Sequence, residues 1–98
     1  MEKRVQDYGK EILNVVRSNV SPAVLAKRLQ DFHENDLADV LQELSVVERC
    51  KLYRVLDMDT LSDIFEYTEE DDVVKYLEEM EVKKAAAILS RMETNVLA

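Results

Sequence analysis

Residues 37–56, which read LADVLQELSVVERCKLYRVL, decide the fold. The first half places apolar residues at intervals of three and four, along one stripe of a helix: Leu37, Val40, Leu41 and Leu44. A second stripe follows at Leu52, Tyr53, Val55 and Leu56. Between the two stripes, Ser45 and Glu48 form the capping-box pattern that starts a helix. The stretch therefore predicts two short helices joined by a tight turn.

The same pattern returns about every 24 residues along the chain. At that spacing several apolar positions coincide, among them Val16, Val40, Ile64 and Ile88, and also Leu13, Leu37, Leu61 and Ala85. Helices this short are marginal on their own, so each pair must cover the apolar face of the next pair. The sequence thus predicts an all-α fold, built as a solenoid of stacked helix pairs.

Local signals place the individual helices. We expect them near residues 3–18, 22–32, 37–44, 46–56, 60–67, 70–80 and 83–92. Ser21 before Pro22 predicts a capped start, and Thr60 with Asp63 gives a weaker capping pattern. The predicted core consists of Leu37, Val40, Leu41, Leu44, Leu52, Leu56, Leu61, Ile64, Phe65, Leu77, Ile88 and Leu89.

Residues 1–98 are interpreted as a single domain, because 98 residues are enough for one domain and too few for two. Charged residues make up 35% and hydrophobic residues 47%, which is a globular composition. One Gly and one Pro leave few places for sheet turns. Glu93–Asn95 looks like the start of one more helix, so we expect the chain to be a fragment cut near Ala98. The alternative is a naturally short C-terminal turn.

The net charge of −8 limits the classes of partner. Nucleic acids and anionic membrane surfaces attract Lys and Arg, so we expect this chain to bind neither. Cations and positively charged proteins remain possible binding partners. The longest apolar run, Ala85–Leu89, is too short to cross a bilayer, and the N-terminal residues lack the apolar stretch of a signal peptide. The single cysteine, Cys50, cannot form an internal disulfide, which suits a reducing compartment.

The sequence contains no recognisable set of catalytic residues, so we expect no enzyme activity. His33 is the only histidine, and it has no second His or Cys at ligand spacing. A loop or capping role is therefore favoured for it over a metal ligand. Cys50 shares a repeat column with Ala26 and Val74, which predicts a small buried apolar group and not a nucleophile.

Charge distribution gives the best indication of a site. Residues 57–81 hold eleven acidic residues and one basic residue, for a net charge of −10. Spacings of four, three and four residues place these acids on or beside one helix face: Asp59, Asp63, Glu66 and Glu70. One interpretation is a solvated acidic face with ordinary helix caps. The other is a surface for a hard cation such as Mg²⁺, which binds oxygen ligands and often keeps most of its waters.

Several motifs resemble the N-terminal domain of MgtE-type magnesium transporters. Phe32-His-Glu-Asn-Asp-Leu-Ala-Asp-Val-Leu41 is similar to that family's Leu-His-Pro-x-Asp-Ile-Ala-x-Leu-Leu motif. Leu44-Ser-Val-Val-Glu-Arg49 resembles its Leu-Pro-x-Glu-x-Arg element. The stretch from Leu56 to Phe65 and the stretch from Ala85 to Met92 resemble two later elements. The order and gapless spacing of these motifs make the joint resemblance more specific than any one of them.

The resemblance implies a right-handed superhelix of short helices. It also implies a setting, in which the domain precedes CBS domains and a transmembrane domain of the same polypeptide, on the cytoplasmic side of the cell membrane. The full-length protein would be a homodimer. Mg²⁺ would bind weakly between this domain and the CBS domains, keep the cytosolic region compact and so close the pore.

At the level of single residues the resemblance carries over in part. Asp63 stands where the family places an acid that contacts interdomain Mg²⁺, and Asp59, Glu66 or Glu70 would assist it. Asn95 stands where a second acid is expected, and an amide brings no charge. A second function stays open, because the middle region of the flagellar motor switch protein resembles this domain in fold. The chain would then be a protein-docking solenoid with no role in ion binding.

Overall fold

The computed structural model of the chain describes residues 8–97, and within that range every regular element is an α-helix. The seven helices are α1 (Tyr8–Arg17), α2 (Pro22–Leu29), α3 (Glu34–Leu41), α4 (Val46–Val55), α5 (Met58–Glu66), α6 (Glu70–Glu78) and α7 (Val82–Leu97). The predicted all-α class is confirmed for these residues. The start of the first predicted helix, at residue 3, lies outside the described residues.

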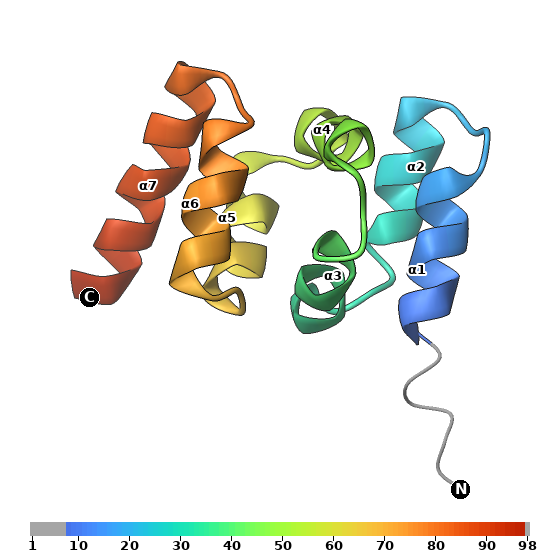
Figure 1. Cartoon of the computed structure of the whole chain (residues 1–98), viewed down its shortest axis with the longest axis horizontal. Coiled ribbons are helices and arrows are strands. Elements are labelled where there is room, and N and C mark those ends of the chain that lie inside the picture. The colour runs from blue at the N-terminus through green and yellow to red at the C-terminus, as the bar shows by residue number, and fades with distance from the viewer. Residues whose placement is uncertain (1–7, 98) are drawn as a thin grey trace, which may run out of the picture.

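The odd-numbered helices pack in a row, with α1 against α3, α3 against α5, and α5 against α7. Helix α2 packs on α1 and α4, and α6 packs on α7. The result is an elongated body of 39 × 31 × 21 Å, with α1 and α2 at one end and α6 and α7 at the other (Figure 1). Equivalent positions of the odd helices are buried: Val16, Val40, Ile64 and Ile88. The 24-residue repeat, the continuous solenoid and its right-handed sense stay predictions.

Two helix starts use the caps expected from the sequence. The Ser21 hydroxyl accepts a hydrogen bond from the backbone N–H of Val24, at 3.3 Å, ahead of Pro22. Ser45 and Glu48 form a complete capping box. In it the Glu48 N–H donates to the Ser45 hydroxyl at 3.2 Å, and the Ser45 N–H donates to the Glu48 carboxylate at 2.9 Å.

Helix α3 begins earlier than predicted, at Glu34 in place of residue 37. The reason is His33, whose Nδ1 accepts a hydrogen bond from the Asn35 N–H at 2.9 Å. The capping role favoured for this histidine is thus confirmed. Its ring also contacts the Tyr67 ring edge-on, with centroids 5.4 Å apart, which joins the start of α3 to the end of α5.

Helix α5 likewise begins early, at Met58, and its cap differs from the prediction. The Asp57 carboxylate accepts a hydrogen bond from the Thr60 N–H at 2.8 Å, which makes Asp57 the N-cap. The predicted cap formed by Thr60 and Asp63 is therefore wrong, because an acid three residues before the expected start, Asp57, accepts from the Thr60 N–H. The Asp63 carboxylate is left without that capping task.

Helix α7 runs without a break from Val82 to Leu97. The prediction that it ends at Met92, and that Glu93–Asn95 starts a new helix, is wrong. No Gly or Pro interrupts residues 82–97, so nothing in the backbone forces a stop. Asn95 lies on this helix, but its side chain is outside the part that the structure describes.

The core matches most of the predicted residues. Those confirmed as buried are Leu37, Val40, Leu41, Leu44, Leu52, Leu56, Leu61, Ile64, Phe65 and Ile88. Leu77 is only half-buried, and Leu89 is 44% exposed, so the prediction for Leu89 is wrong. Successive residues of a helix point about 100° apart. Ile88 is fully buried, whereas Leu89, the next residue, lines the open grooves between α6 and α7.

Cys50 is half-buried, which corrects the expectation of a buried thiol. Its Sγ lies 3.9 Å from the backbone oxygen of Glu79, at the edge of the contact between α4 and the end of α6. Val74, in the same predicted repeat column, is 55% exposed. This column therefore lies at the border of the core and not inside it.

No helix of the described part combines the length and apolar character that a membrane span requires.

We expect Leu41→Ala to lower the free energy of unfolding by about 2–5 kcal/mol, because the fully buried side chain would leave a cavity. Leu89→Ala is the matched control. It removes the same atoms from an exposed position and should cost about 0.5 kcal/mol or less. Urea unfolding of both variants measures the difference, and equal losses would show that the core assignment is wrong.

Candidate functional site

Three of the four predicted ligands share an exposed face of α5. Asp59, Asp63 and Glu66 all lie at exposed positions, spaced four and three residues apart. The opposite side of the helix is fixed in the core by Leu61, Ile64 and Phe65, which are all buried. Since burial of the apolar stripe sets the rotation of the helix, the carboxylates face outward.

Asp63 lies at the centre of this acidic face. Loss of part of its hydration raises the pKa of the Asp63 carboxyl, and the negative charges of Glu34, Glu66, Asp59 and Asp57 raise it further. Glu34 comes from the first turn of α3, so the like charges come from two helices. Repulsion of this kind favours whatever neutralises it, either a proton or a cation.

Asp59 has a partner within the domain. Its carboxylate accepts a hydrogen bond from the Arg91 guanidinium at 2.5 Å, and this ion pair joins α5 to α7. Both side chains are largely exposed, so the pair is a weak one. A cation that used Asp59 as a ligand would still have to compete with Arg91.

Glu70 lies on a different part of the surface. It opens α6 beside Asp71 and Asp72, where acidic side chains suit the positive end of the helix dipole. With Glu66 it lines a groove between α5, α6 and α7. Glu66 thus lies between the α5 face and this groove. The structure brings Asp59, Asp63 and Glu66 together, adds Glu34, and places Glu70 to one side.

The α5 face is not a complete metal-binding site. In the part of the chain that the structure describes, no group of three or more His, Cys, Asp or Glu residues is arranged to hold a metal ion. Mg²⁺ requires oxygen ligands but can take as few as one or two from a protein, with water completing the octahedron. The donor chemistry of the face fits such an ion, with the remaining ligands supplied by water or by an opposing surface.

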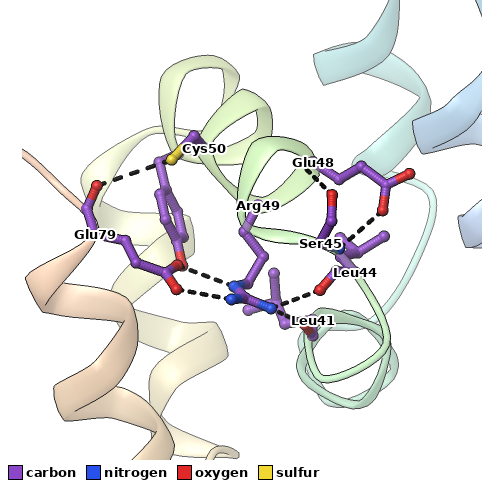
Figure 2. Close-up of polar contacts among 8 residues, drawn as sticks. Leu41, Leu44, Ser45, Glu48, Arg49, Cys50 and Glu79 are labelled. Carbon is purple, nitrogen blue, oxygen red and sulfur yellow. Dashed lines mark hydrogen bonds and ion pairs between the residues drawn. The ribbon is translucent and has the colours of Figure 1, made fainter.

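A buried arginine holds the helices behind this face. Arg49, on α4, is only 4% exposed. One end of its guanidinium donates to the backbone oxygens of Leu41 and Leu44, at 3.3 and 2.6 Å, where α3 ends (Figure 2). The other end binds both carboxylate oxygens of Glu79, at 2.9 and 2.7 Å, just after α6. Arg49 therefore links three helices through charge-assisted hydrogen bonds.

Two tyrosines complete this polar junction. The Tyr53 hydroxyl donates to Glu79 at 2.7 Å, and the Tyr76 ring lies 5.1 Å from the Arg49 guanidinium carbon. Hydrogen bonds from Arg49 hold the pKa of Glu79 below its ordinary value, while burial and the bond to Glu79 raise the pKa of Tyr53. Each charge has a partner at neutral pH, so the junction has a structural role.

Sequence reasoning missed this junction. Arg49 and Glu79 are 30 residues apart, and no helical or strand spacing relates them. In the sequence, Glu79 is one of eleven acids in residues 57–81, and nothing there distinguishes it from the others. The one available signal is Arg49 itself, which stands between the apolar stripes of residues 37–56, because arginine is the cation best suited to a buried pair with a carboxylate.

The sequence model of the family described as "MgtE intracellular N domain" matches residues 32–98. The match includes α3 to α7, and with them the α5 face and the Arg49 junction. Neither the curated proteins nor the solved structures gave a match.

Replacing Asp63 by Asn should stabilise the domain at neutral pH. The raised pKa of Asp63 means that the folded state binds the proton more tightly than the unfolded state. The free energy of unfolding therefore falls as pH rises from below the ordinary pKa of an Asp carboxyl to above the raised pKa. At pH 7 the penalty is fully present, and its removal should gain up to about 0.5 kcal/mol for such an exposed group. Below about pH 3 the two proteins should unfold alike. A destabilised variant at pH 7, in thermal unfolding, would contradict this assignment.

Arg49→Met should lower the free energy of unfolding by about 3–5 kcal/mol, because the partly buried charge of Glu79 would lose its ion pair and keep only the Tyr53 hydroxyl as a partner. Arg49→Lys keeps the positive charge but cannot bind both carboxylate oxygens in the same way. Its free energy of unfolding should therefore lie between those of the unmodified protein and Arg49→Met. The control is Arg17→Met, since Arg17 binds Glu48 at 2.8 Å in an exposed ion pair and its loss should barely move the unfolding midpoint. Urea unfolding would contradict a structural role if Arg49→Met behaved like the control.

Proposed function

Since the chain belongs to the family of the MgtE intracellular N domain, we propose that it is the cytosolic regulatory domain of a magnesium transporter. The family is one of transporters and not of enzymes. In this proposal the domain senses Mg²⁺ through the acidic face of α5, opposite the CBS domains of the same polypeptide. The state of that contact then gates the pore in the transmembrane domain of a homodimer.

The observation that carries the proposal is the environment of Asp63. Its carboxylate points outward among four like charges, and it does not cap its own helix, because Asp57 does so. A carboxylate with a raised pKa and no capping task is suited to bind a divalent ion. By the resemblance to the family, the same residue is expected to stand where an acid contacts interdomain Mg²⁺.

Electrostatic repulsion would make the compactness of the cytosolic region depend on the Mg²⁺ concentration. Two acidic surfaces that face each other repel, and a divalent cation between them removes the repulsion and adds shared ligands. When Mg²⁺ is scarce, the surfaces separate and the pore opens. When Mg²⁺ is abundant, the cytosolic region becomes compact and the pore closes. The α5 face and its CBS counterpart would each supply only part of the ligand set.

An incomplete ligand set gives low affinity. The isolated domain should bind Mg²⁺ with a dissociation constant on the order of millimolar, in the range of weak carboxylate sites. Asp59 would contribute less than Asp63 because Arg91 competes for it. Glu66 could reach the ion from the same face, whereas Glu70 would act mainly through its long-range negative charge.

The test uses the full-length protein. Asp63→Ala should shift Mg²⁺-dependent protection of the cytosolic region to higher Mg²⁺, seen as greater protease sensitivity at a given concentration. Asp39→Ala is the matched control, because Asp39 is an exposed acid on α3 outside the acidic segment.

An unchanged Mg²⁺ midpoint in Asp63→Ala would refute the role of this residue. Protection independent of Mg²⁺ in the unmodified protein would refute the sensing function as a whole. That second result would favour the alternative of a protein-docking solenoid with no role in ion binding.

A further inference from the structure

The outer side of α6 and α7 carries two apolar grooves. One has a volume of about 790 Å³ and the other about 470 Å³. Both are lined by Val74, Leu77 and Leu89, so they form one continuous surface. We call it the α6–α7 face. Two of the shared residues are large and exposed, Val74 at 55% and Leu89 at 44%.

This face lies at one end of the row of helices (Figure 1). Helices α3 and α5 each pack between two odd-numbered neighbours, whereas α7, at the end of the row, packs chiefly on α5 and α6. It also reaches α4 through Lys84, which donates to the backbone oxygen of Tyr53. Val82, at the start of α7, is 83% exposed and extends the apolar surface. Continuous apolar surfaces with polar rims mark interaction sites on soluble proteins.

The rim of the face is acidic. Glu66, Glu70 and Asp71 border the larger groove, and Glu78 borders the smaller one. The grooves are lined by no Lys or Arg in the part of the chain described. An apolar floor with a uniformly negative border selects apolar side chains flanked by positive ones.

We propose that the α6–α7 face docks an amphipathic α-helix of a partner protein, with Lys and Arg flanking its apolar stripe. A groove between two helices accepts a third helix through side chains at every third or fourth position. Ala85 and Ala86 leave room for close approach, and Met80 and Met92 adapt to varied side chains. A second copy of this chain is disfavoured as the occupant, because two acidic rims would face each other.

This interaction needs no Mg²⁺ and does not depend on the proposed function. The test is therefore made in EDTA, with the 98-residue chain and a labelled synthetic peptide of about four helical turns. The peptide carries Leu at the contact positions and Lys on either side. A matched peptide carries Glu in place of Lys. Fluorescence anisotropy gives both affinities, and binding of the Lys peptide should weaken as salt rises.

Val74→Lys should weaken binding of the Lys peptide roughly tenfold or more, because it places a charge on the floor of the groove and reverses the local complementarity. Val47→Lys is the control. It makes the same change in net charge at a 78% exposed valine on α4, and should leave the affinity unchanged. Circular dichroism checks that both variants are folded.

Three results would overturn the proposal. One is an equal loss of affinity in the two variants, which would mean binding through net charge alone. Another is equal binding of the Glu peptide, which would remove the electrostatic argument. The third is a dimer of the chain in sedimentation that Val74→Lys abolishes, since the face would then be an interface between copies.

Discussion

The Arg49 guanidinium is the interaction on which the arrangement of the helices depends. It satisfies carbonyls at the end of α3 and a carboxylate at the end of α6, from a position inside α4. Apart from this junction, the two ends of the molecule are joined chiefly by the packing of α3 on α5. A buried ion pair adds little net stability compared with apolar packing, but it tolerates few geometries. Here it fixes how the later helices sit on the earlier ones.

That arrangement determines which side chains meet solvent. With α3 and α5 locked side by side, the first turn of α3 brings Glu34 close to Asp63, and the His33–Tyr67 contact holds the same two helices together. The carboxylates of α5 lie on one exposed face because the apolar residues of the helix are buried in the core. The acidic side chains of α3 and α5 are thereby concentrated on one face, as the proposed cation sensing requires.

Much of this could be predicted from the sequence, because local rules govern it. Apolar spacing gave the helices, the capping box at Ser45 gave the start of α4, and the outward position of Asp63 followed from the stripe of α5. The misses are non-local or depend on competing residues. Asp57 took the capping position from Thr60, Leu89 lines a groove that stays partly open to solvent, and the Arg49–Glu79 pair has no sequence spacing that could reveal it.

The central claim is that a divalent ion binds at Asp63. Mn²⁺ takes the same oxygen ligands as Mg²⁺, and its paramagnetism broadens nearby amide signals even when binding is weak. The direct measurement is therefore a Mn²⁺ titration of the domain followed by NMR. The account predicts that broadening centres on α5 around Asp63 and on the first turn of α3, and that excess Mg²⁺ reverses it. Broadening centred on Glu69–Asp72 instead, or spread evenly over the acidic surface, would contradict it.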